Sequence, residues 1–214
     1  MKHKPSVLIV ALTSVLLAFP AIAQAAFAPR VSVSVDPATP AARPAIEATV
    51  FETSGDTPPK RFTLAFPAGF ALKHPSGVKA CKPRQRRAGR CRRSSEIGSL
   101  EAVTVSGVRL RGTVNLARHG RRRQIIGVVK GRAAGLPNLS FVGYARLGPA
   151  GSPQVTLDGL PNVPLVSLTV RLTGGRRGLL STPKGCGTQT VQGLLTSQLG
   201  ELAIGLSAVQ IAGC

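Results

Sequence analysis

Short runs in which apolar and polar residues alternate recur along most of the chain. Val31 to Val35 places valine on one side and serine on the other, and residues 45–51 and 61–66 show a similar period of two. Alternation of this kind is typical of β-strands that bury one face. Further strand-like runs lie at residues 100–105, 108–116, 124–129, 139–147, 154–157, 165–172, 188–197 and 202–211. Together the runs predict an all-β protein.

Turn-forming residues separate these runs. Asp36-Pro37 ends the first, residues 55–59 follow the second, and residues 135–138 precede another. No segment of residues 27–214 has a helical period with capping residues at its ends. Strands that recur about every 8–15 residues with turns between them predict an antiparallel β-sandwich. The sandwich would have one or two units, and a division would fall near residues 149–153.

Residues 1–25 are expected to be a secretory signal peptide. Met1 to Lys4 is cationic, residues 7–19 are largely apolar, and Ala23-Gln24-Ala25 is a small-x-small cleavage pattern. The apolar run stops at Pro20 and is shorter than the ~20 residues that span a bilayer. We therefore expect residues 26–214 to be secreted, either extracellular or associated with the cell envelope, with no transmembrane segment after cleavage.

All four cysteines follow this leader. Cys81, Cys91, Cys186 and Cys214 allow three pairings, and proximity in the sequence favours Cys81–Cys91 and Cys186–Cys214. Disulfides form and persist in an oxidising compartment outside the cytoplasm. Neither pair has the C-x-x-C spacing of a zinc site, so the sequence predicts structural disulfides and no metal ligand.

The C-terminal third resembles a known protein family. The shared motifs lie at residues 66–70, 157–165, 168–170, 174–180 and 186–188, with the Cys81/Cys91 pair between the first two. These motifs are similar to those of an uncharacterised family of secreted all-β proteins from high-GC actinobacteria. The resemblance implies export and an antiparallel, immunoglobulin-like β-sandwich held by disulfides, and it supplies no catalytic residues.

The strongest chemical signal is an excess of positive charge, with a formal net charge of +20 and only eight acidic residues. Much of it lies in two clusters. The first, in and just beyond the Cys81–Cys91 loop, comprises Lys82, Arg84, Arg86, Arg87, Arg90, Arg92 and Arg93. The second, at an expected hairpin tip, comprises Arg118, Arg121, Arg122 and Arg123. Guanidinium groups held at high density can bind phosphates or carboxylates. If both clusters share one end of the fold, they form a single basic pole.

The predicted partners are anionic cell-wall or surface polymers. Nucleic acid is disfavoured because Tyr144 is the one tyrosine and no aromatic residues interleave with the cations. A structural or adhesive envelope module with incidental charge is the alternative. A secreted hydrolase is less favoured, because there is no G-x-S-x-G or H-E-x-x-H motif and neither His74 nor His119 has an acidic neighbour. We predict a non-enzymatic protein without catalytic residues, metal or cofactor, and leave its oligomeric state open.

Overall fold

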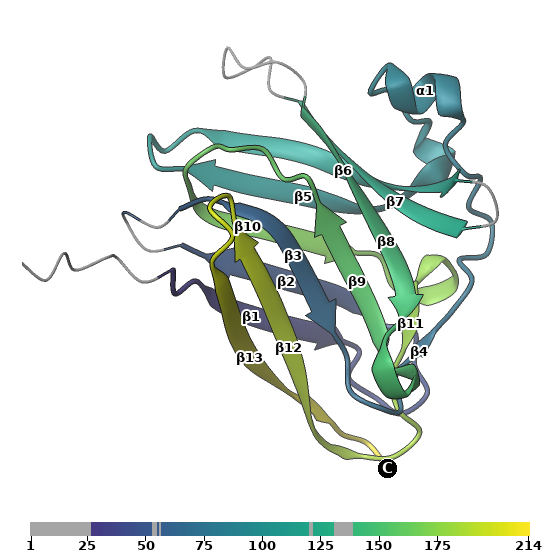
Figure 1. Ribbon diagram of the computed structural model, residues 1–214. Helices are drawn as coiled ribbons and strands as arrows, with labels where there is room; N and C mark the ends of the chain where they lie inside the picture. The colour runs from purple at the N-terminus through teal and green to yellow at the C-terminus, as the bar shows by residue number, and fades with distance from the viewer. Residues whose placement is uncertain (1–26, 53–54, 56, 120–121, 131–138) are drawn as a thin grey trace, which may run out of the picture.

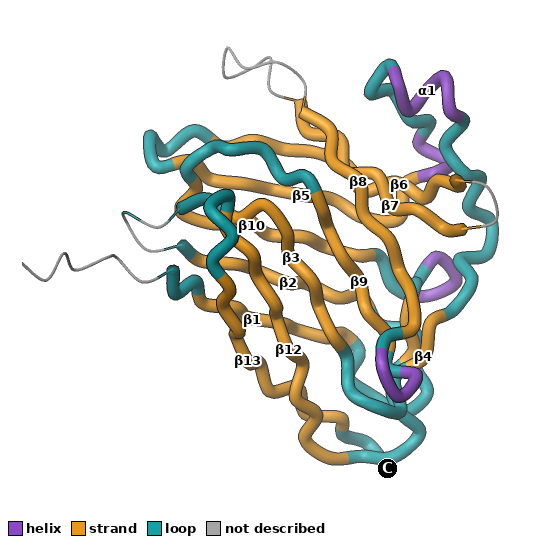
Figure 2. Tube along the Cα trace, in the orientation of Figure 1, coloured by secondary structure: helices purple, strands orange, loops and turns teal. Residues whose placement is uncertain are grey.

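The computed structural model describes residues 27–52, 55, 57–119, 122–130 and 139–214, and most of its regular structure is β-strand (Figure 2). Eleven strands lie where the alternating runs predicted them, because each buries alternate side chains against a common core. They are β1 (Arg30–Asp36), β2 (Ala45–Phe51), β3 (Pro59–Ala65), β5 (Glu96–Thr104), β6 (Arg109–His119), β7 (Arg122–Lys130), β8 (Leu139–Leu147), β9 (Pro153–Asp158), β10 (Leu165–Leu172), β12 (Gly187–Ser197) and β13 (Leu202–Ile211).

Short elements that the sequence did not predict lie between these strands. Two-residue strands β4 (Ala71–Leu72) and β11 (Leu180–Ser181) pair with each other outside the main sheet. The helix α1 (Pro83–Arg87) interrupts the segment expected to be a loop, and none of its residues is buried. With no buried residue, α1 shows no apolar period. Three 3₁₀ turns complete the description: η1 (Arg93–Ser95), η3 (Pro149–Gly151) and η4 (Gly175–Arg177).

The eleven main strands form one antiparallel sheet in the order β1-β2-β10-β5-β6-β7-β8-β9-β3-β12-β13 (Figure 1). Hairpins join several neighbours, but β10 lies between β2 and β5, and β3 lies between β9 and β12. The sheet curls until its two edge strands, β1 and β13, lie against each other. The outcome is a barrel-like sheet that is nearly closed.

A side chain bridges the seam between the edge strands. The Val33 N–H donates to Ser207 Oγ at 2.9 Å, and the Ser207 hydroxyl donates to the Val33 carbonyl at 3.3 Å. Val31 packs against the paired glycines Gly193 and Gly205, where an added Cβ would come within 2.8 Å of its side chain. The absence of side chains at these two positions lets β1 approach the β12–β13 hairpin closely.

The concave side of the sheet encloses one large apolar core. Its fully buried side chains come from strands across the sheet and include Val50, Phe62, Val114, Ile125, Leu195 and Ile211. A second, smaller cluster lies on the opposite face of β6 and β7, under the Cys81–Cys91 disulfide. That outer face can be apolar because a covalently closed loop covers it.

The antiparallel all-β class and both disulfides are confirmed. The strands form one continuous sheet instead of two separate ones, so the immunoglobulin-like arrangement stays a prediction. Residues 149–153, where a division was predicted, link β8 to β9, and these strands pair in the sheet. The predicted signal peptide lies outside the described residues. Within the described part, no helix is long and apolar enough to cross a bilayer.

Candidate polyanion-binding site

The first cationic cluster sits on a short segment that is fastened to the outside of the sheet. Cys81 is bonded to Cys91, and its backbone N–H donates to the Leu116 carbonyl of β6 at 2.8 Å. The two cysteines pack on three outward-facing residues of β6 and β7, namely Ala117, Ile126 and Val128. The disulfide thus gives an otherwise polar loop a small apolar base.

Local backbone bonding shapes the loop between the two cysteines. Pro83 occupies the first turn of α1, where a missing N–H costs nothing and the fixed φ suits a helix. Gln85 Oε1 accepts from the Lys82 N–H at 3.2 Å. Gly89 then adopts a positive φ of 59°, which favours glycine, and the chain turns back toward Cys91.

The structure places the first cluster beside the strands that carry the second. Arg86 Nη1 donates to Gln124 Oε1 of β7 at 2.7 Å, and Cys81 bridges to Ala117 of β6. Gln124 follows Arg123, and Ala117 precedes Arg118. These strands form the predicted hairpin, with Arg118 opposite Arg123 and His119 opposite Arg122. Arg121 lies outside the described residues.

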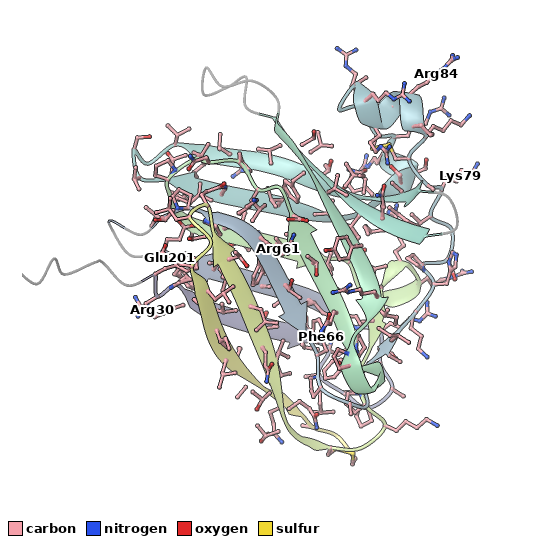
Figure 3. All side chains as sticks on the ribbon, in the orientation of Figure 1. Arg30, Arg61, Phe66, Lys79, Arg84 and Glu201 are labelled. Carbon is pink, nitrogen blue, oxygen red and sulfur yellow. A yellow bond between two sulfur atoms is a disulfide. The ribbon has the colours of Figure 1, made fainter. Side chains whose placement is uncertain are left out.

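The side chains of the loop point into solvent. Lys82, Arg84, Arg87, Arg90, Arg92 and Arg93 are exposed, and Arg86 is half-buried. Figure 3 shows Arg84 projecting from α1 beyond the body of the sheet. A shallow, open depression on this segment is lined by Lys82, Pro83, Arg84, Gln85 and Arg87. Three cations therefore surround one hollow.

Tertiary structure adds arginines that sequence reasoning missed. Arg177 Nη2 donates to the Arg93 carbonyl at 3.3 Å, which joins η4 to the cationic segment. Arg43 Nη1 donates to the Arg176 carbonyl at 3.4 Å. The doublet Arg176-Arg177 was visible in the sequence, but nothing local signalled that it or Arg43 would reach residues 73–93. We define the basic pole as the side chains of Arg43, Lys79, Lys82, Arg84, Arg86, Arg87, Arg90, Arg92, Arg93, Arg176 and Arg177, together with the strand ends that carry Arg118, Arg122 and Arg123.

The carboxylates that form ion pairs do so with cations outside the basic pole. Among the described residues, the ion pairs join Arg61 to Asp158, Arg109 and Arg111 to Glu101, and Arg171 to Glu47. None of them contains a cation of the basic pole. Arg61–Asp158 and Arg171–Glu47 are both bidentate, and the hydrogen bonds from Arg61 hold the pKa of the Asp158 carboxyl below its ordinary value. Among the described residues, the cations of residues 79–93 therefore form no ion pair with a carboxylate.

Of the two histidines considered for catalysis, His74 is the one whose side chain the structure describes. His74 is exposed, and its Nδ1 lies 2.9 Å from the carbonyl of the adjacent Pro75. The side chain of His119 lies outside the described part of the structure. Within the described ranges, no three residues among His, Cys, Asp and Glu are grouped so that they could hold a metal ion.

No protein-family model matches the sequence, and no curated protein is significantly similar to it. The two disulfides are compatible with an extracellular protein.

Proposed function

We propose that this protein is a secreted, non-enzymatic β-sheet protein that binds anionic envelope polymers through its basic pole. The observation that carries the proposal is that a crosslinked segment holds many cations, none of which forms an ion pair among the described residues. A free chain with so many cations would extend by self-repulsion, whereas the Cys81–Cys91 disulfide keeps its cations together on β6 and β7. Preorganised charges lose less conformational entropy on binding than mobile ones.

The arrangement suits an extended ligand with repeated negative groups. The basic pole is assembled from segments near residues 43, 79–93, 118–119, 122–123 and 176–177, so a polymer could contact several segments at once. The depression lined by Lys82, Arg84 and Arg87 is suited to one phosphate or carboxylate of such a polymer. Export, the resemblance to the actinobacterial family and an immunoglobulin-like arrangement of the strands remain predictions that accompany this proposal.

The test measures retention of the mature, oxidised protein on purified cell envelopes over a range of salt concentrations. We expect retention to fall steeply with salt, because exposed charges are screened over about 8–10 Å at physiological ionic strength. Replacing Arg84, Arg86, Arg87 and Arg90 with serine should weaken retention at least tenfold, since each arginine near an anionic surface contributes on the order of 1 kcal/mol.

A matched control removes the same charge elsewhere. The substitutions Arg30→Ser, Lys60→Ser, Arg109→Ser and Arg146→Ser remove four exposed cations outside the basic pole. We expect this variant to lose much less retention than the loop variant. Equal losses would reduce the effect to net charge, and retention independent of both salt and the loop would favour a structural or adhesive module. Competition by free DNA, but not by anionic wall polymer, would favour the nucleic-acid alternative.

A further inference from the structure

The outward face of the β12–β13 hairpin carries no charged side chain. In both strands the side chains alternate, so residues of even number point away from the core. The antiparallel register places these residues opposite one another in five pairs. They are Thr188, Thr190, Gln192, Leu194, Thr196, Leu202, Ile204, Leu206, Ala208 and Gln210. Charged residues make up 17% of the chain, so a run of ten uncharged positions on one face stands out.

Half of this face is an aliphatic row open to solvent. Leu202, Ile204 and Leu206 are 79%, 68% and 63% exposed, and Leu194 lies directly across from Ile204. On β3 the same face continues with Thr63, Ala65 and Arg61, and the charge of Arg61 is paired with Asp158. Contiguous exposed apolar surface marks interaction sites, and depletion of charge is typical of the centre of a protein–protein interface.

We propose that a second copy of this chain docks on the outward face of the β12–β13 hairpin. A two-fold contact brings the same patch of both copies together. The full sequence carries a net charge of +20, so two copies of this basic protein repel each other, and the outward positions of β12 and β13 offer a contact that contains no cation. The cations of α1 lie away from this contact, since α1 sits by β6 and β7 at the upper right of Figure 1, whereas β12 and β13 lie at the lower left.

The shape of the face also fits a second sheet. Paired strands pack face to face with other strands at about 10 Å, and their side chains interdigitate. A lipid surface would instead favour basic residues among the aliphatic ones, and the even-numbered positions of β12 and β13 have none. The occupant that matches an uncharged, two-stranded face is therefore another such face.

The available area sets the expected strength. Strands of 11 and 10 residues are roughly 33 Å long, and β3, β12 and β13 together are about 15 Å wide. Each copy would thus bury roughly 500 Å², so that the total is near the ~1,000 Å² expected of the smallest specific interfaces. We expect a dimer that dissociates in the micromolar range.

The experiment is sedimentation equilibrium of the mature, oxidised protein from about 1 to about 500 µM at physiological salt. The hairpin variant Ile204→Thr/Leu206→Thr places threonine, a residue that favours strands, at both positions, and we expect its dimer Kd to rise at least tenfold. The matched control Phe51→Thr/Val105→Thr removes two exposed apolar side chains away from the hairpin, and its Kd should not change. A second variant, Ile204→Lys, should abolish the dimer, because two-fold symmetry brings like charges together.

Two results would overturn the proposal. One is a wild-type protein that stays monomeric over the whole range, and the other is a dimer that the hairpin variants leave intact while circular dichroism shows them folded. Flotation with neutral phosphatidylcholine vesicles identifies the rival occupant. A monomer that floats, and that sinks when Ile204 and Leu206 are replaced, would assign this face to lipid instead.

Discussion

Two regions of this molecule are closed by a disulfide, and they differ in almost every other respect. The Cys81–Cys91 loop lies outside the sheet, carries dense positive charge and touches β6 and β7 through a few apolar side chains. The Cys186–Cys214 bridge joins the two ends of the β12–β13 hairpin, whose strands are hydrogen-bonded over ten residue pairs and whose outer face is uncharged.

A disulfide therefore has a different physical role in each of the two regions. In the loop, the crosslink substitutes for a core, because a segment composed mostly of cations cannot bury enough apolar surface to stay ordered. In the hairpin, the crosslink secures strands that already pair, and it holds the last residue of the chain in place. We expect the first bridge to control binding and the second to control the stability of the fold.

The largest expected effect comes from removing each bridge in turn. In the chain-entropy model, Cys186→Ser/Cys214→Ser should lower the free energy of unfolding by about 3.5 kcal/mol, because the bridge spans 28 residues. Cys81→Ser/Cys91→Ser, with a span of 10, would lose about 3 kcal/mol if the loop unfolded with the sheet. We expect a smaller global loss, since the loop can detach alone. Urea unfolding and limited trypsin digestion measure the two effects.

The two bridge variants control for each other. The loop variant should show faster trypsin cleavage between residues 84 and 93 than the wild type, with most of its sheet stability retained. Cys186→Ser/Cys214→Ser should show the opposite result, with a large loss of sheet stability and no faster trypsin cleavage of the loop. If both variants lost the same free energy of unfolding and the loop were not cleaved faster, the loop would be an integral part of the sheet's cooperative unit. The contrast between the two bridges would then be wrong.

A smaller effect is expected where β1 approaches the hairpin. Gly193→Ala would place a Cβ 2.8 Å from both methyl groups of Val31, and such overpacking costs about 1–3 kcal/mol. The same substitution in a Val31→Ala background should cost less than about 1 kcal/mol, because the clash is then relieved. Gly185→Ala is the control, since nothing lies within 4 Å of its added Cβ. Additive losses in the double variant would mean that Val31 does not set the seam.

The smallest expected effect concerns the ion pair beside the uncharged face. Arg61 Nε and Nη2 each lie 3.0 Å from an oxygen of Asp158, and this lowers the pKa of the carboxyl in the folded state. A lowered folded-state pKa stabilises the protein at pH values above the ordinary carboxyl range. That contribution is lost as the pH falls through the folded-state pKa.

Asp158→Asn should therefore cost about 0.5 kcal/mol at neutral pH, and the cost should vanish in acid. Stability measured from neutral pH down to about pH 2 tests the sign, because the wild-type and variant curves should converge there. Asp36→Asn removes an exposed carboxylate that is outside the ion pairs of the described residues and serves as the control. Parallel curves for Asp158→Asn and the wild type would show that the pair adds no pH-dependent stability.

Local pattern was enough to locate the main strands and the cationic cluster. A strand with one buried face must alternate apolar and polar residues, so the sequence alone predicts the strands at Val31 to Val35 and Leu165 to Leu172. The pairings Cys81–Cys91 and Cys186–Cys214 agree with proximity in the sequence, since short separations bring cysteines together at the lowest entropic cost. The cationic cluster of residues 82–93 is contiguous, so it is visible in the sequence without knowledge of the fold.

Tertiary structure alone decided how these pieces meet. The placement of β10 between β2 and β5, and of β3 between β9 and β12, depends on contacts between segments far apart in the chain, which no local period encodes. The same holds for Arg43 and Arg177, which join the basic pole through backbone carbonyls of distant loops. Near-closure of the sheet depends on Val31 meeting two glycines more than 160 positions away, because only there can the edge strands approach.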